Sequence, residues 1–398
     1  MKSKTRILSC FLILCSLILA IALPQPVFAA EPEIVSPSAI LIEQSTGKVL
    51  YEKDADTPRR PASVTKVMTI LLAYEAVRDG KASMEDMVTV SANAAGYGGS
   101  TILLEEGEQI SLQNLIKGMC IASGNDAAIA TAEYIGGSQD GFVDMMNQRA
   151  QELGMVNTHF VNPCGLDADG HVTTARDIAL MSRELMLNFP EVTEFTTTWH
   201  EMMPHVWRSG PGETDMANTN HLIQSYNGMT GLKTGFTRLA KYSLSATATR
   251  GDMSLIAVVM GAERKDQRSQ DVTRMLDYGF GSFTLQTIET DGQSAGKVSV
   301  AGGMQSEIDT RVQGNLQLLS SKDQAVDAQN LTTRIDMAPS IHAPVAEGDP
   351  VGTITYLQND EEVATLPLVA AQSVEESTLG KRLMLLIDSW VDKIAENQ

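Results

Sequence analysis

The sequence predicts an α+β protein followed by a small all-β domain and a C-terminal amphipathic helix. Strand-like patterns at residues 39–53 and 242–261 flank a helical middle, which is typical of an α+β domain. From residue 283 to 372 the pattern changes to short alternating strands, most clearly in a hairpin over residues 351–369. Apolar residues at helical spacing then follow. We therefore expect domains at residues 31–282, 283–372 and 373–398.

The helical middle is divided by glycine and by loop-forming residues. Met68, Leu71 and Leu72 have helical spacing in a segment that starts near Ser63, just after a proline, and that Gly80 ends. Further helices are expected at residues 111–122, 125–135, 141–153 and 268–279, and a loop at residues 156–176.

The N-terminus has the pattern of a secretory signal. A basic start precedes an almost unbroken apolar run from Ile7 to Leu23, and Val27-Phe28-Ala29 then offers the small residues that signal peptidase reads. We therefore expect a signal peptide at residues 1–29 and an exported protein. The alternative is a retained N-terminal membrane helix.

The charge of the chain excludes some partners. Its formal net charge is −19, and removal of residues 1–30, which hold three of the 30 basic residues and none of the 49 acidic ones, makes it −22. Such a surface repels nucleic acid and bare anionic lipid, so no nucleic-acid partner is expected.

The C-terminal segment has an apolar stripe that suits a membrane surface. Its charged residues prevent it from spanning a bilayer, so hydrophobic burial would have to hold it in the interface. The alternative is a helix packed on its own domain or on a partner. The stripe consists of Leu379, Leu383, Leu386, Ile387, Trp390 and Ile394.

Cysteine and histidine give no metal site. Only Cys120 and Cys164 remain after signal cleavage; they can pair as a disulfide or stay as buried thiols, and we favour the thiols. His200 and His205 are one residue too far apart for a zinc-binding His-Glu-x-x-His, and Pro204 breaks the helix that this motif needs. We expect no metal and no cofactor.

One of three Ser-x-x-Lys patterns has the context of a nucleophile. The pattern occurs at Ser45, Ser63 and Ser294, but only Ser63 opens a predicted helix, where residues three apart share a face and Lys66 can reach the hydroxyl. Ser294 also lies in a Gly-x-Ser-x-Gly pattern, but a strand follows it instead of the helix that a nucleophile elbow requires. A lysine acts as base only if burial or nearby positive charge lowers its pKa.

Two further motifs can complete such a site. Lys233-Thr234-Gly235 precedes a predicted strand, where Lys233 and Thr234 can hold a carboxylate and Gly235 lets a substrate backbone approach. Ser123-Gly124-Asn125 lies between two predicted helices, where the hydroxyl can relay a proton and the amide can bind a carbonyl. Each motif alone is more typical of a solvated surface segment.

In this order the three motifs resemble the D-alanyl-D-alanine carboxypeptidases, the low-molecular-mass penicillin-binding proteins. The resemblance covers residues 36–280 and, more weakly, the β domain and the terminal helix. It implies a β-lactamase/transpeptidase-like domain with an antiparallel sheet and helices. The stretches that carry it are residues 60–69, 122–128, 171–177 and 231–237.

The resemblance implies a serine peptidase that removes the terminal D-Ala from peptidoglycan stem pentapeptides and that β-lactams acylate. Ser63 would be the nucleophile, Lys66 its base and Ser123 a proton shuttle. Asn125, Lys233 and Thr234 would bind substrate beside Gly235, and the backbone N–H groups of Ser63 and Phe236 would form the oxyanion hole. The enzyme would work on the outer face of the cytoplasmic membrane, in the cell-wall space.

The chain departs from the family at two positions, and three other functions compete with this assignment. Thr219 stands where some relatives have an arginine near the carboxylate, and Lys241 stands where a glycine is frequent. A class A β-lactamase would need a glutamate in the loop at residues 157–177, which has none. A catalytically inactive penicillin-binding sensor is disfavoured because every motif residue is present. An endopeptidase would use the same residues.

Overall fold

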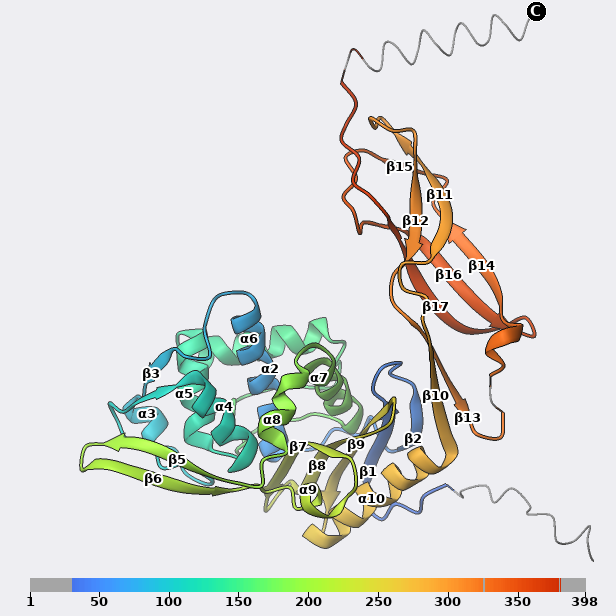
Figure 1. Ribbon diagram of the computed structural model, residues 1–398. Helices are drawn as coiled ribbons and strands as arrows, with labels where there is room; N and C mark the ends of the chain where they lie inside the picture. The colour runs from blue at the N-terminus through green and yellow to red at the C-terminus, as the bar shows by residue number, and fades with distance from the viewer. Residues whose placement is uncertain (1–30, 325, 379, 381–398) are drawn as a thin grey trace, which may run out of the picture.

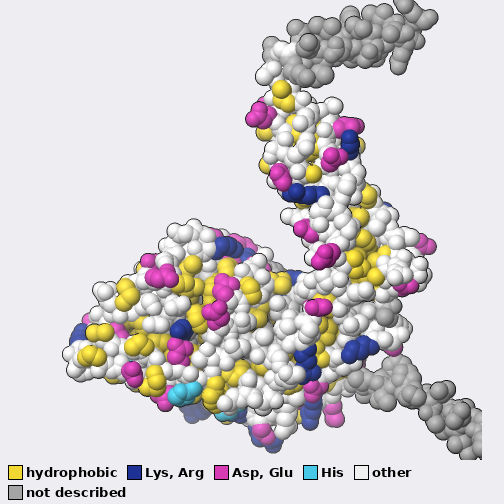
Figure 2. Space-filling model, in the orientation of Figure 1, with side chains coloured by type: hydrophobic (Ala, Val, Ile, Leu, Met, Phe, Trp, Pro, Cys, Tyr) yellow, Lys and Arg dark blue, Asp and Glu magenta, His cyan; other side chains and the backbone are white. Residues whose placement is uncertain are grey.

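The computed structural model describes residues 31–324, 326–378 and 380. A broad α+β body is followed by a slender all-β body that extends away from it (Figure 1). The predicted signal peptide and most of the predicted C-terminal helix lie outside the described residues. On the face that Figure 2 shows, acidic and basic side chains are interspersed over both bodies.

A five-stranded antiparallel sheet forms the centre of the first body. Its strand order is β2-β1-β9-β8-β7, so β7 is an edge strand that pairs only with β8. Six residues in succession, Leu255 to Met260, are buried in β9 because helices cover both faces of the sheet. The strands are β1 (Ser38–Glu43), β2 (Val49–Lys53), β7 (Met229–Thr237), β8 (Lys241–Arg250) and β9 (Met253–Ala262).

The helices pack on the two faces of this sheet. Helix α10 (Lys265–Ser282) packs against one face, and α7 (Ala175–Asn188) and α2 (Lys66–Arg78) lie on the other. Helix α2 is buried from Lys66 to Ala76, which agrees with its apolar character on all sides. The remaining helices are α3 (Ala92–Ala95), α4 (Leu112–Ile121), α5 (Asn125–Gly136), α6 (Gln139–Glu152), α8 (Thr193–Thr196) and α9 (Leu222–Ser225), with 3-10 turns η1 (Ala62–Thr65) and η2 (Pro190–Val192).

Two small antiparallel pairs complete the first body. Strands β3 (Met87–Thr89) and β4 (Gln109–Ser111) pair before α4. Strands β5 (His200–Trp207) and β6 (Gly210–Ala217) form a long hairpin that projects to the side in Figure 1. The sequence analysis did not predict this hairpin.

The second body is all β and has its own apolar core. Its six-stranded sheet has the order β14-β16-β17-β12-β11-β15, and the predicted hairpin at 351–369 is β16–β17. Residues 374–377 are still bonded to this body, for example through Ser377 N to Gly302 O, so the predicted tail begins after them and not at residue 373.

The bounds of this second body's elements follow. They are β10 (Phe283–Ile288), β11 (Ser294–Ala301), β12 (Glu307–Val312), β13 (Leu316–Ser321), η3 (Ala328–Asn330), β14 (Thr332–Met337), β15 (Ser340–His342), β16 (Pro350–Gln358) and β17 (Glu361–Ala370). Ser294 starts strand β11, so its Gly-x-Ser-x-Gly pattern has no helix after it, as predicted.

Candidate active site

Ser63 lies in the 3-10 turn η1, directly before α2. The turn brings the side chains of residues three apart together, and Lys66 Nζ lies 3.0 Å from Ser63 Oγ. Ala62 has a φ of 50°, an unfavourable value for alanine. The pair predicted from the Ser-x-x-Lys pattern is therefore in hydrogen-bonding contact.

Lys66 is completely buried and is held by three oxygen atoms. Besides Ser63, its Nζ donates to Asn125 Oδ1 at 2.6 Å and to the carbonyl of Cys164 at 2.8 Å. Burial lowers the pKa of Lys66 to about 8, while Cys164 and Asp126 pull it upward. A useful fraction of this amine is therefore neutral near physiological pH and can accept a proton.

Lys233 brings a second buried amine to the same region. It lies on β7 and donates to Thr234 O at 3.1 Å. Burial and then the charge of Lys66 hold the pKa of Lys233 well below its ordinary value. For Lys66 the cause of the lowered pKa is burial, and the repulsion between the two amines lowers the pKa of Lys233.

The edge strand β7 runs beside the nucleophile because Gly235 has no side chain. A Cβ atom on Gly235 would lie 3.1 Å from Ser63 N and 3.0 Å from Pro61 O. The next residue, Phe236, is half exposed, and its ring stacks on Tyr242 with centroids 4.3 Å apart. The unpaired edge of β7 thus adjoins Ser63.

The third motif lies in the turn between α4 and α5. Ser123 is buried and has a φ of 63°. Asn125 starts α5 and donates from Nδ2 to Gly98 O at 2.7 Å, which turns its Oδ1 toward Lys66. The structure therefore links Asn125 directly to the Ser63–Lys66 pair and places Ser123 two residues before it.

The loop between α6 and α7 supplies contacts that sequence reasoning missed. Asn162 Oδ1 accepts from the N–H groups of Cys164, Gly165 and Leu166, which fixes the Cys164 carbonyl over Lys66. His171 holds the same loop to the turn η1: Val161 N donates to its Nδ1, so its Nε2–H donates to Thr65 Oγ1 at 2.9 Å. An isolated asparagine in a loop gives no sequence signal for this role.

Arg268 is a second feature that sequence reasoning missed. It lies on α10, is 3% exposed, and its Nε has no hydrogen-bond partner in the described part of the chain. Burial lowers its pKa to about 10, and its charge further lowers the pKa of Lys233. A signal for Arg268 was present in the sequence. It lies four residues before Val272, so helical spacing places this charged residue on the apolar face of α10.

Thr219 contacts the Lys233-Thr234-Gly235 motif directly. Its Oγ1 lies 2.6 Å from Thr234 Oγ1, so the threonine that replaces the arginine of some relatives orients the hydroxyl of Thr234. The other departure, Lys241, forms an ion pair of 3.1 Å with Glu263 at the start of β8.

The two cysteines are free, buried thiols. Burial raises the pKa of Cys120 to about 12 and also raises that of Cys164, so neither is a nucleophile at neutral pH. Within the described residues, no group of three histidine, cysteine, aspartate or glutamate side chains is arranged to hold a metal ion.

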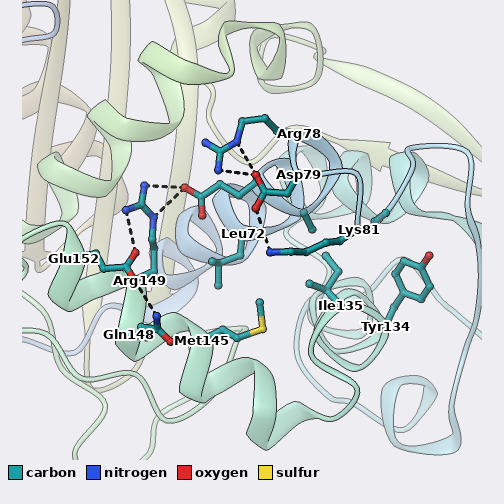
Figure 3. Close-up of a pocket in the computed structure, with 13 residues that line it drawn as sticks. Leu72, Arg78, Asp79, Lys81, Tyr134, Ile135, Met145, Gln148, Arg149 and Glu152 are labelled. Carbon is teal, nitrogen blue, oxygen red and sulfur yellow. Dashed lines mark hydrogen bonds and ion pairs between the residues drawn. The ribbon is translucent and has the colours of Figure 1, made fainter. Parts of the chain in front are cut away.

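A cavity of about 590 Å³ lies at the other end of α2 and is separate from this site. Figure 3 shows Asp79 between Arg78 and Lys81 on one side and Arg149 beside Glu152 on the other. These charged groups pair with one another, so the cavity offers no activated nucleophile or base. The Ser63–Lys66 pair lies at the opposite end of this helix.

Two family models match the chain, one over each body. The family model of D-alanyl-D-alanine carboxypeptidase matches residues 25–264, and the model of the C-terminal domain of penicillin-binding protein 5 matches residues 283–376. No helix of the described residues has the length and apolar character needed to cross a membrane.

Relatives and solved structures match along most of the chain. D-alanyl-D-alanine carboxypeptidase DacF of Bacillus subtilis is 40% identical over 357 residues, covering 89% of each chain. D-alanyl-D-alanine carboxypeptidase DacC of Escherichia coli is 36% identical and covers 91% of this chain and 92% of its own. The crystal structure of penicillin binding protein 5 from Haemophilus influenzae superposes with a TM-score of 0.71 at 28% identity, covering 87% of this chain and 99% of its own.

Proposed function

Because the chain belongs to the family of serine D-alanyl-D-alanine carboxypeptidases, we propose a role in that reaction for each residue of its site. The enzyme removes the terminal D-Ala from peptidoglycan stem pentapeptides through a serine acyl-enzyme, which β-lactams also form. The observation that carries the assignment of the nucleophile is the 3.0 Å contact between Ser63 Oγ and the buried amine of Lys66.

Acylation begins with proton transfer from Ser63 to Lys66. The neutral amine takes the hydroxyl proton as Oγ attacks the carbonyl of the penultimate D-Ala, and a tetrahedral oxyanion forms. The N–H groups of Ser63 and Phe236 stabilise this oxyanion. The proton then passes through Ser123 to the leaving amine, and the terminal D-Ala departs. Water, activated by the same lysine, hydrolyses the acyl-enzyme.

The terminal carboxylate of the substrate binds on β7. Lys233 and Thr234 hold it, and Thr219 orients the Thr234 hydroxyl at 2.6 Å. Burial disfavours the ammonium form of Lys233 in the free enzyme, and an incoming carboxylate restores that form because it supplies the opposite charge. Arg268, buried close to Lys233 without a partner for its Nε, adds positive potential. Asn125 holds the peptide backbone of the substrate.

The test is the mass of the product from a synthetic stem pentapeptide. We expect loss of one alanine with wild-type protein, no reaction with Ser63→Ala, and full activity with Ser294→Ala, which removes the serine of the competing pattern. Labelled penicillin should attach to Ser63 in the same preparations. Attachment at Ser294 or Ser45 would refute the assignment. A cross-linked stem-peptide dimer as second substrate measures any endopeptidase activity.

We also propose that the enzyme is exported and held on the outer face of the cytoplasmic membrane. Residues 1–29 support export because they have the pattern of a signal peptide. The apolar stripe from Leu379 to Ile394 supports attachment through the interface, since the charges within it prevent a spanning helix. The strongly acidic chain makes hydrophobic burial the driving force.

A further inference from the structure

A buried histidine–carboxylate pair joins the β5–β6 hairpin to the rest of the first body. His205 Nδ1 lies 2.7 Å from Glu108 Oε1, and the exposed fractions of the two side chains are 0% and 1%. The ring of His205 stacks on Trp207 with centroids 4.9 Å apart. Its Nε2 has no hydrogen-bond partner among the described residues. The mechanism proposed above uses neither residue.

The contacts define the proton arrangement of this pair. A carboxylate only accepts hydrogen bonds, so Nδ1–H of His205 donates to Glu108 Oε1. Glu108 Oε2 also accepts from Glu105 N at 3.1 Å. The other charged groups at this contact are Glu105, Glu106 and Arg208. Arg208 donates from its backbone N–H to Glu105 and from its guanidinium to Glu106.

The hairpin holds one segment of chain, residues 98–108, along its length. Trp207 Nε1 donates to Leu103 O at 3.0 Å, and Thr214 Oγ1 donates to Ile102 O at 3.0 Å. The His205–Glu108 bond lies at the end of the segment and, like the Thr214–Ile102 bond, is buried.

The same segment holds the catalytic asparagine. Gly98 O accepts from Asn125 Nδ2 and Ser100 O accepts from Asn125 N, both at 2.7 Å. The carboxylate of Asp126 accepts from the N–H groups of Ile102 and Leu104. Asn125 Oδ1 in turn accepts from Lys66 Nζ at 2.6 Å. A continuous set of hydrogen bonds therefore leads from the hairpin to the general base.

We propose that His205 and Glu108 are positioning residues for catalysis, whose buried bond fastens the hairpin to segment 98–108 and so keeps Asn125 against Lys66. This inference rests on the proposed role of Lys66 as the base. Without the bond, Glu108 loses its side-chain partner, the segment moves from α5, and water reaches Lys66. A misplacement of about 1 Å at a catalytic group can cost 100-fold in rate.

The test compares three variants for acylation of Ser63 by labelled penicillin. His205→Phe keeps a ring against Trp207 but removes the donor, and we expect acylation to slow roughly 10- to 100-fold. His205→Asn keeps a donor near the place of Nδ1, so it should stay close to wild type. The matched control is His200→Phe, since His200 and Asp215 form an exposed pair on the same hairpin; it should have no effect.

The pH profile separates positioning from a loss of stability. Water around Lys66 would raise its pKa toward the ordinary lysine value, so the pH profile of acylation by His205→Phe should shift upward. The groups that face Lys66, namely Lys233, Asp126 and Cys164, are unchanged in this variant. A variant that is only less stable would lose active protein without a shift in the profile.

Several results would overturn the inference. One is wild-type acylation by His205→Phe; another is equal loss in His205→Asn, which would make the ring and not the bond responsible. If His205→Phe does not fold, Trp207→Phe is the second test. It removes the bond to Leu103 O, another bond between the hairpin and segment 98–108, so acylation should slow. Failure of the wild-type protein to label at Ser63 would instead refute the proposed function.

Discussion

At the residue scale, the proposed reaction needs a lysine amine that is partly uncharged and can still accept a proton. Lys66 donates to Ser63, to Asn125 and to the Cys164 carbonyl, and complete burial lowers its pKa to about 8. The acceptors keep the amine in place, and burial keeps part of it uncharged. Burial and the charge of Lys66 also hold the pKa of Lys233 well below its ordinary value.

This arrangement predicts the pH dependence of acylation. The base must be neutral, and its pKa is lowered from 10.5 to about 8, so the rate should rise as pH increases through about 8 and level off above it.

Lys66→Ala should lose roughly 10²- to 10⁴-fold of the rate at the plateau while remaining folded. Rates of labelling by penicillin, measured across pH for the wild-type protein and for Lys66→Ala, test both expectations. A loss below about tenfold would mean that another group acts as base.

At the scale of elements, the loop between α6 and α7 presses against the nucleophile turn. Gly165 has a φ of 90°, and a Cβ atom there would lie 1.9 Å from Ala62 O. Asn162 fixes this loop through three backbone N–H groups. The loop therefore positions both the serine, through the turn at Ala62, and the lysine, through the carbonyl of Cys164.

Substitution of this glycine should separate site geometry from backbone strain. Gly165→Ala should abolish most acylation, because the turn at Ala62 or the Cys164 carbonyl must move. Gly170→Ala is the matched control: Gly170 has a φ of 80°, but the nearest atom to its Cβ, His159 Cδ2, is 3.8 Å away. Each substitution should lower the free energy of unfolding by about 1–3 kcal/mol, because alanine is strained at a positive φ. Equal acylation by both would contradict the role assigned to the loop.

At the scale of the whole molecule, the all-β body extends away from the α+β body that contains the site (Figure 1). The described chain remains bonded to this body as far as Ser377, whose N–H donates to Gly302 O. The proposed membrane-binding stripe therefore follows a complete domain.

Removal of the tail should release the enzyme without inactivating it. Truncation after Thr378 keeps the bond from Ser377 to Gly302, so the β body should stay folded. Burial of four large apolar side chains contributes about 6 kcal/mol before ordering costs, which is enough for reversible attachment. We expect the truncated enzyme in the soluble fraction with full activity on small peptides. A full-length variant in which Leu383, Leu386 and Trp390 are replaced by Ser should behave in the same way. High salt should not release the intact protein. A truncated form that stays membrane-bound would locate the anchor elsewhere.

The sequence by itself determined the chemistry and the main elements because those signals are local. Ser63 and Lys66 are three residues apart at a helix start, so their contact follows from helical geometry alone. The predicted helices at 111–122 and 125–135 are α4 and α5, and glycine at the end of the second marks its limit. The order of the three motifs then identified the family.

Only the tertiary structure decided how the base is held and what surrounds it. Lys66 meets Asn125 across 59 residues of sequence and Cys164 across 98, and no local pattern encodes such contacts. Residues 200–207 alternate between exposed and buried positions, but the sequence analysis weighed their histidines only as metal ligands. His205 instead bonds Glu108 across 97 residues, and Arg268 becomes notable only because the fold buries it close to Lys233. Burial and long-range pairing arise when the chain closes on itself, so they belong to the fold and not to any segment.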